Sequence, residues 1–224
     1  MNVNRAELGA ATAGGERSGE PAPRTQAERS EATRGALLRA ARELFADRGY
    51  ADVGTEEIVR RAGVTRGALY HHFEGKADLF RAVFEQMEEE LAARFATEAL
   101  SNEDPYEALG AGVELFLDVC MEPEVQRIAL LDAPSVLGWE QWREIEARYS
   151  LGLVRAGLEA AMEAGAIEPQ PLDPLAHVML GAMMETGLFV ARAGDVPTAR
   201  SQGGRVLRSL LEGLRAPHPA ARLD

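Results

Sequence analysis

The stretch TEEIVRRAGVTRGALYHHFEGKADLF, residues 55–80, decides the fold of this 224-residue chain. Thr55 is a good N-cap for a short helix that stops at the glycine of Ala-Gly63. Thr65 begins a second short helix that ends near His72. A small residue and a glycine at the intervening turn let two helices cross closely. This spacing predicts a helix-turn-helix, whose second helix enters the major groove of DNA.

The second helix divides into two faces when its residues are placed about 100° apart. One face carries the residues expected to meet DNA: Arg66, Gly67, Tyr70 and His71. The other carries those expected to pack: Ala68, Leu69, His72 and Phe73. An arginine can donate two hydrogen bonds to guanine, and a glycine lets the helix approach the base edges closely. The helix therefore has the composition of a reading helix.

Helical periodicity continues on both sides of this stretch. Apolar positions from Ser30 onward lie on one stripe of a helix that Gly49 ends, and another helix follows Gly75. Further helices are expected over residues 105–120, 123–131, 139–164 and 173–192, and after Pro197. Asp132 and Pro134 are expected to end the second of these. No segment shows strand alternation, so the fold class is all-α.

Composition and charge restrict the function. Hydrophobic residues make up 46% of the chain, enough for a sizeable core, and no apolar run reaches membrane-spanning length. The single cysteine and the absence of an apolar leader favour the cytoplasm. The net charge is −12, but residues 24–85 carry +1 whereas residues 86–224 carry −12. This asymmetry suggests a near-neutral DNA-facing module on an acidic body that phosphates would repel.

A dense set of positions around the helix-turn-helix matches one known pattern: Leu44-Phe45, Gly49-Tyr50, Ile58, AGVTRGALYHHF at 62–73, Lys76 and Leu79. Residues 33–85 resemble the N-terminal domain of TetR-family regulators. The resemblance implies phosphate contacts from Thr55, Tyr70, His71 or His72, and Lys76. It implies that Thr65, Arg66 and Gly67 face the bases. It also implies a larger helical domain that dimerises through its last two long helices and holds an effector pocket.

The chain is accordingly expected to comprise a tail (1–29), a DNA-binding domain (30–85), a ligand-binding and dimerisation domain (86–216) and a C-terminal tail (217–224). Pocket candidates are the aromatic, sulfur and histidine side chains of the larger domain: Phe116, Cys120, Trp139, Trp142, Tyr149, His177, Met183 and Met184. Dimer-interface candidates lie on the last two helices: Val178, Ala182, Met183, Val206, Leu207, Leu210, Leu211 and Leu214. Core packing remains an alternative for the aromatic and methionine residues, and Cys120 is expected to be a small buried hydrophobe. The run Glu88-Glu89-Glu90 is expected to be a solvated face.

The expected partners are double-stranded operator DNA, a second copy of the chain and an unidentified small-molecule effector. The function expected is that of a repressor released from a palindromic operator by that effector. One alternative is a constitutive dimeric DNA-binding protein without an effector. The other is an all-α enzyme, but the sequence offers no triad, glycine-rich phosphate loop, metal cluster or recognisable carboxylate pair. No catalytic residue, metal or cofactor is therefore expected.

Overall fold

The computed structural model describes residues 25–98 and 102–216, and they fold almost entirely into helices. The first part contains α1 (Gln26–Arg48), α2 (Thr55–Ala62), α3 (Arg66–His72) and α4 (Lys76–Glu98). The second contains α5 (Pro105–Val119), α6 (Pro123–Val125), the π-helix η2 (Gln126–Asp132), α7 (Ala133–Leu137), α8 (Trp139–Glu163), α9 (Leu172–Ala191) and α10 (Val196–Glu212). Across the described residues the one β-type pairing is an isolated bridge between Ile167 and Arg215. The all-α prediction is confirmed.

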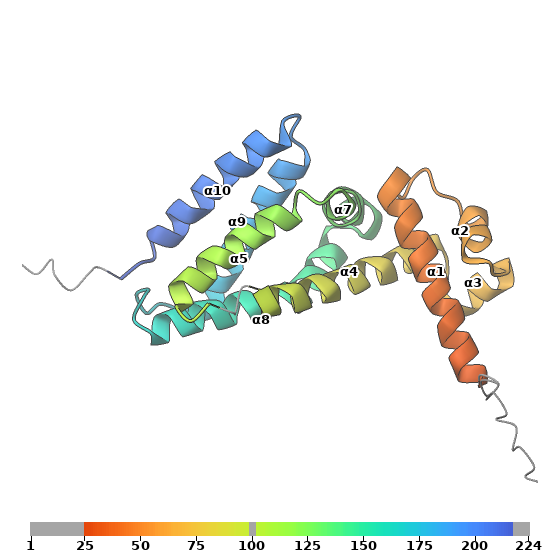
Figure 1. Ribbon diagram of the computed structural model, residues 1–224, viewed down its shortest axis with the longest axis horizontal. Coiled ribbons are helices and arrows are strands. Elements are labelled where there is room, and N and C mark those ends of the chain that lie inside the picture. Colours follow the sequence, from red (N-terminus) through yellow and green to blue (C-terminus); the bar gives the residue numbers. More distant parts are fainter. Residues whose placement is uncertain (1–24, 99–101, 217–224) are drawn as a thin grey trace, which may run out of the picture.

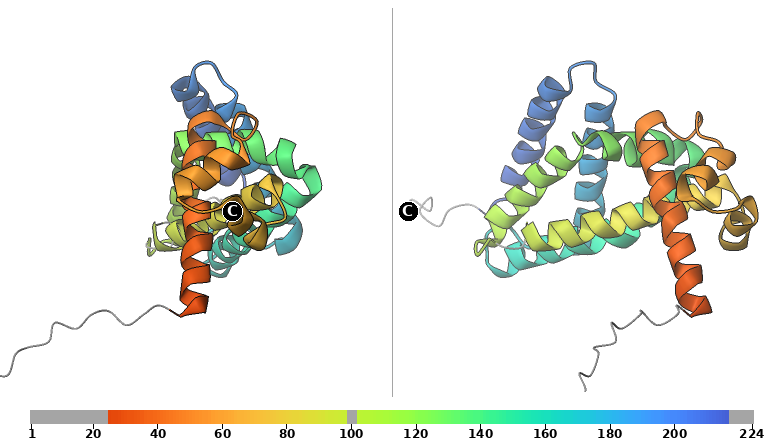
Figure 2. Two further views of the ribbon diagram at one scale, coloured as in Figure 1. Left: turned by 90° about the vertical axis from the view of Figure 1, so that its right-hand side faces the viewer. Right: turned by 45° about the vertical axis from the view of Figure 1, so that its right-hand side comes forward.

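The helices form a small head and a larger body at opposite ends of an elongated molecule. Helices α1, α2 and α3 make the head, and α9 and α10 lie at the far end of the body (Figure 1). Helix α4 runs from the head along α8, so it belongs to both parts. Two rotated views show the same separation (Figure 2). The head is thus held out from the body, where it can meet a large partner.

Aromatic rings fill the centre of the head. Phe45 of α1 and Phe80 of α4 are fully buried, and their ring centroids lie 5.3 Å apart with an edge-on geometry. The ring of Tyr50 packs edge-on against Phe80 at 5.2 Å. Leu69 anchors α3 beneath them with no exposed surface. The apolar stripe of α1 therefore fixes where α3 lies.

Helix α1 begins at Gln26, four residues before the expected start at Ser30. Thr25 forms a capping box with Glu28: the Glu28 amide donates to Thr25 Oγ1 at 3.2 Å, and the Thr25 amide donates to the Glu28 carboxylate at 2.7 Å. Residues 26–29 are therefore helical and do not belong to a tail. Residues 1–24 of the expected N-terminal tail and the C-terminal tail at 217–224 lie outside the described residues.

The junction between head and body lies at the end of α1. Gly49 has φ +82°, and a Cβ added there would meet the Arg127 guanidinium at 1.8 Å, so only glycine fits. Arg127 donates to the Arg48 carbonyl at 3.1 Å, and the Tyr50 amide donates to the Asp132 carboxylate at 2.7 Å. Both Arg127 and Asp132 belong to η2. The π-helix therefore holds the head.

The helical path does not stop at Asp132 and Pro134, contrary to expectation. It continues from η2 directly into α7 and ends at Gly138, which has φ +80°. The wider turns of η2 come directly before Pro134, which has no N–H to donate to a preceding carbonyl. The helix expected over residues 123–131 is therefore largely a π-helix, and α7 lies where the sequence predicts a loop.

Candidate DNA-binding site and body cavities

The turn between α2 and α3 has the backbone of a helix-turn-helix. Gly63 has φ +68°, in the left-handed region, and the next amide, that of Val64, donates to the Val59 carbonyl at 3.0 Å. Thr65 caps α3, as predicted, because its Oγ1 accepts from the Ala68 amide at 3.2 Å. The other predicted cap is wrong: Gly54 is the N-cap of α2, and Thr55 is its first helical residue.

The predicted division of α3 into two faces agrees with the burial of its residues. Leu69 and Phe73 are buried, and Ala68 and His72 are half-buried. The expected DNA-facing residues are exposed, together with the cap: Thr65, Arg66, Gly67, Tyr70 and His71. An exposed polar face on a firmly anchored helix is what insertion into a groove requires.

Two neighbouring side chains hold the Arg66 guanidinium on this face. Its guanidinium donates to the Glu56 carboxylate of α2 at 2.8 Å and lies 5.5 Å from the centroid of the Tyr70 ring. Both members of the ion pair are about two-thirds exposed, so water screens the pair and it contributes little to stability. DNA can therefore displace Glu56 without disrupting the head.

Lys76 has a structural role in addition to any contact with phosphate. Its ammonium donates to the Tyr50 carbonyl at 2.8 Å and to the Val53 carbonyl at 2.9 Å, and it lies 4.0 Å from the centroid of the Tyr50 ring. These hydrogen bonds hold the backbone of the segment between α1 and α2 in place. An ammonium has three donors, so one remains for a phosphate oxygen.

Gly67 is not required by the fold, because a Cβ added there would meet nothing closer than Thr65 Oγ1 at 3.9 Å. Gly67→Ala is therefore expected to raise the free energy of unfolding by about 0.5–1 kcal/mol, through the gain in helix propensity. If the glycine serves close approach to bases, the same variant binds operator DNA more weakly. Thermal unfolding and an operator titration measure the two effects. Gly110→Ala, in α5 and equally unobstructed, is the control that leaves DNA binding unchanged.

Small cavities lie among the described residues of the body. The first, about 90 Å³, is lined by apolar residues of α4, α5, α8, α9 and α10, including Phe95 and Met183. The second, about 40 Å³, lies between α4, α5, α6, η2, α8 and α9, and Phe95 also lines it. Among the predicted pocket residues, five line these cavities: Met183 the first, and Phe116, Cys120, Trp142 and Met184 the second.

Three predicted pocket residues line neither cavity. Trp139 is 62% exposed and stacks near Trp142 outside the second cavity, with ring centroids 5.0 Å apart. His177 is exposed, and its Nδ1 lies 2.8 Å from the Asp173 carbonyl on its own helix. Tyr149 is half-buried and packs against the core. The assignment of these three residues to a pocket stays a prediction.

Two carboxyl groups are buried beside the second cavity. Glu88 of α4 is 8% exposed and Glu146 of α8 is 1% exposed, so Glu88 does not belong to a solvated face. Burial, with the charge of Glu146, raises the pKa of Glu88 to about 8. Burial raises the pKa of Glu146 to about 7, against the opposing effect of Arg143. Cys120 lies in the same wall, and burial raises the pKa of its thiol to about 12, which fits a small buried hydrophobe.

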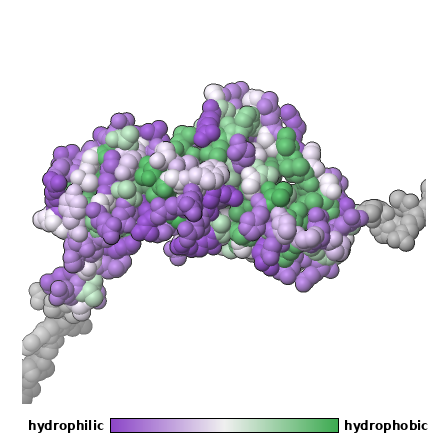
Figure 3. All heavy atoms as spheres, turned by 180° about the vertical axis from the view of Figure 1, so that it is seen from behind, coloured by the Kyte–Doolittle hydropathy of each residue, from purple (hydrophilic) through white to green (hydrophobic). Residues whose placement is uncertain are grey.

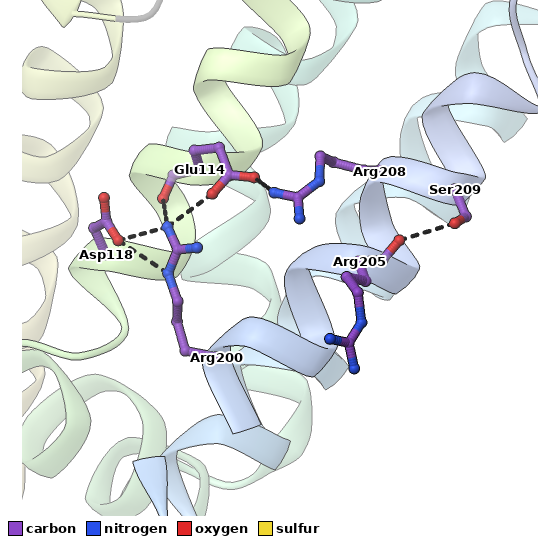
Figure 4. A network of polar contacts seen from close by, with 6 residues as sticks. All are labelled: Glu114, Asp118, Arg200, Arg205, Arg208 and Ser209. Atoms are coloured by element: carbon purple, nitrogen blue, oxygen red, sulfur yellow. Dashed lines mark hydrogen bonds and ion pairs between the residues drawn. The ribbon is translucent and has the colours of Figure 1, made fainter. Parts of the chain in front are cut away.

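Helix α10 is fastened to α5 by ion pairs. Arg200 contacts Glu114 and Asp118, and Arg208 contacts Glu114 (Figure 4). Gly203 allows α10 to approach α9, since a Cβ there would meet Thr186 Cγ2 at 2.5 Å. These contacts fix which side of α10 faces the body.

The last two helices leave apolar side chains on their outer face. Val178 and Phe189 of α9 and Val206 and Leu210 of α10 are between 46% and 66% exposed. Green, apolar surface is more extensive on the body than on the head (Figure 3). Helix α9 is long and apolar enough to cross a membrane by length and composition alone, but it packs on α8 and α10 within the body.

The other predicted interface residues face the protomer itself. Leu207 and Leu211 are buried in the core of the body, which excludes them from a contact between copies in this conformation. Ala182, Met183 and Leu214 are partly buried against the same core. The apolar stripe of α10 is therefore divided between an inner and an outer face.

Comparison with known proteins agrees with this architecture. Residues 37–83 match the family of bacterial regulatory proteins named after TetR, and residues 106–214 match a tetracycline repressor-like C-terminal domain. The chain is 34% identical to a TetR-family transcriptional regulator from Pectobacterium atrosepticum, whose crystal structure it matches with a TM-score of 0.79 over 87% of this chain and 99% of that one.

Two further relatives are named as regulators of opposite sign. The repressor BepR from Brucella suis is 29% identical over 87% of this chain and 97% of its own. The activator FasR from Mycolicibacterium smegmatis is 40% identical over 106 residues, 47% of this chain and 46% of its own. These names denote transcriptional regulators and not enzymes. With its helix-turn-helix head and matching body, the chain belongs to the TetR family of transcriptional regulators.

Proposed function

We propose that this regulator is a homodimer that binds a palindromic operator and is released from it by a small-molecule effector. The observation that carries the proposal is the exposed face of α3, held by buried Leu69 and capped by Thr65. Arg66 and Gly67 would face the bases with Thr65, while Thr55, Tyr70, His71 or His72, and the third donor of Lys76 would contact phosphates. A regulator of this kind works in the cytoplasm.

The dimer is proposed to form through α9 and α10. Val178, Phe189, Val206 and Leu210 form an exposed apolar face on two helices already joined to one another. A second copy related by a two-fold axis would cover this face as a four-helix interface. Such a pairing also gives each half of a palindrome its own head.

Coupling between effector and operator would pass through η2. Ala129 and Leu130 of η2 line the second cavity, while Arg127 and Asp132 of the same helix hold the end of α1. A ligand that enlarges the cavity would therefore displace the element that orients the head. Heads no longer spaced for successive major grooves, about 34 Å apart, bind the operator less tightly. We propose that the regulator represses transcription, as the name of its relative BepR says of that protein.

One observation favours the alternative, a dimeric DNA-binding protein without an effector. Cavities of about 90 and 40 Å³ are smaller than the roughly 300–1,000 Å³ of most ligand pockets. The two buried carboxyl groups favour an effector, because burial of a carboxyl group is costly and Glu146 Oε1 has no hydrogen-bond partner.

The proposal is tested by operator binding of Arg66→Ala. We expect the variant to lose about 1–3 kcal/mol on the cognate site and to relax the base preference at one position. The logarithm of affinity should fall with that of salt concentration by roughly 0.9 per phosphate neutralised. Arg155→Ala, which removes an exposed arginine of the body, is the matched control. Equal affinity for scrambled DNA, or an unaltered Arg66→Ala protein, contradicts the assignment of α3.

A further inference from the structure

The second cavity contains polar atoms that the protein itself leaves without partners. Glu146 Oε1 and the indole Nε1 of Trp142 make no hydrogen bond. Both atoms are buried, and both residues are at most 1% exposed. The other oxygen of Glu146 accepts from Arg143 at 2.5 Å. No hydrogen bond to the Glu88 carboxyl occurs within the described residues. Two carboxyl groups thus share one cavity with a single arginine beside them.

A cation is the partner that the two carboxyl groups of this cavity lack. Buried carboxylates require a compensating charge, and without one they hold a proton instead. The raised pKa values of Glu88 and Glu146 agree with a proton taking the place of that compensating charge. Trp142, Phe116 and Phe95 contribute aromatic walls, and aromatic faces attract organic cations.

The first cavity extends this site with apolar surface. Phe95 lines both cavities. Met183 lines the first cavity, and its neighbour in sequence, Met184, lines the second. The two spaces thus meet at Phe95, and flexible methionine side chains adapt to different shapes. The joined space has an acidic, aromatic end and a hydrocarbon end.

We infer that the two cavities together bind an apolar organic cation, with its ammonium group between Glu88 and Glu146 and its hydrocarbon body beside Phe95 and Met183. Binding here acts as the effector signal only if the proposed function holds, because η2 lines the same cavity. Metal ions are a poorer fit, since the remaining wall is apolar and aromatic and supplies few oxygen ligands.

Hexyltrimethylammonium is a suitable probe, with hexanoate and 1-hexanol as the anionic and neutral controls. The chain has two tryptophans, so Trp139→Phe leaves Trp142 as the reporter within the cavity. We expect the ammonium probe to change Trp142 fluorescence saturably and hexanoate to have no effect. Equal binding of the three probes overturns the inference.

Carboxylate variants test which groups recognise the charge. In the Trp139→Phe background, Glu88→Gln with Glu146→Gln should weaken binding of the ammonium probe about tenfold or more and leave 1-hexanol unaffected. Glu89→Gln, the exposed neighbour of Glu88, is the matched control. Glu146→Asp keeps the charge and should retain most of the selectivity for the cation. Unchanged affinity in the double variant overturns the inference.

Proton release is an independent readout. Because burial raises the pKa of Glu88 to about 8 and that of Glu146 to about 7, a cation bound between them should expel protons into solution, while the raised pKa of Cys120 keeps its thiol out of this exchange. Calorimetry in two buffers of different ionisation enthalpy measures this release, which the double variant should lose. Operator affinity of the unliganded protein is measured separately. Cation binding without operator binding refutes the proposed function alone, and operator binding without cation selectivity refutes this inference alone.

Discussion

Leu210→Asp is expected to yield a monomer that has lost tight binding to its operator. Leu210 is 46% exposed in the single chain, so a charge there leaves the protomer's own core intact. In the proposed interface the same charge is buried without a partner, which is costly. Two heads that no longer bind together lose about 10²–10⁴-fold in affinity for a two-site operator.

Light scattering and an operator titration measure both effects, and circular dichroism should report unchanged helix content. Ser201→Asp is the control: it adds the same charge at an exposed position about half a turn away around α10. Val178→Asp, on the outer face of α9, should reproduce the effect of Leu210→Asp. A dimer that survives in Leu210→Asp places the interface elsewhere.

Asp132→Ala is expected to loosen the head from the body. The carboxylate accepts from the Tyr50 amide at 2.7 Å and lies 3.5 Å from Arg127 Nε, so its removal leaves both groups without an anionic partner. Hydrogen bonds to a charged group contribute about 1.5–3 kcal/mol, and we expect a loss of stability of this size. The orientation of the heads should become less defined, which weakens operator binding as well.

Hydrogen exchange of the Tyr50 amide tests this directly, because the wild-type amide is protected by the bond to Asp132. Chemical denaturation gives the change in stability. Asp132→Asn keeps an acceptor and should retain part of the protection, while Asp118→Ala removes an exposed carboxylate that binds Arg200 in the body and should leave Tyr50 protected. Wild-type exchange at Tyr50 in Asp132→Ala would show that η2 does not hold the head.

Much of the fold follows from local signals in the sequence. Pro105 begins α5, the Ala-Gly63 turn separates α2 from α3, and Gly49 ends α1, each because the residue permits or forbids a particular backbone. The start of α1 was also readable, since Thr25 and Glu28 have the spacing of a capping box. The continuation of the helix past Asp132 into α7 was not, because a proline after Asp132 normally signals a break.

The candidate sites were only partly predictable for a different reason. A helical stripe shows that α10 is apolar on one side, but it does not show which neighbour covers each part, so Leu207 and Leu210 received the same assignment. Glu88 stands in a run of three glutamates, a pattern typical of solvated surface, and only the tertiary packing of the body buries it. The face of α3 was predictable because a two-turn helix with one buried leucine has a single way to pack.

The contact between Arg66 and Glu56 has a consequence for how the regulator searches a genome. If Arg66 reads a base, as proposed, that base must offer Arg66 a better bond than Glu56 already provides. A guanine in the right register can do so through two acceptors. On other sequences Arg66 would keep its internal partner and add no bond to the DNA. Discrimination would then appear as a short residence time on wrong sites, with rapid departure and little change in the rate of encounter.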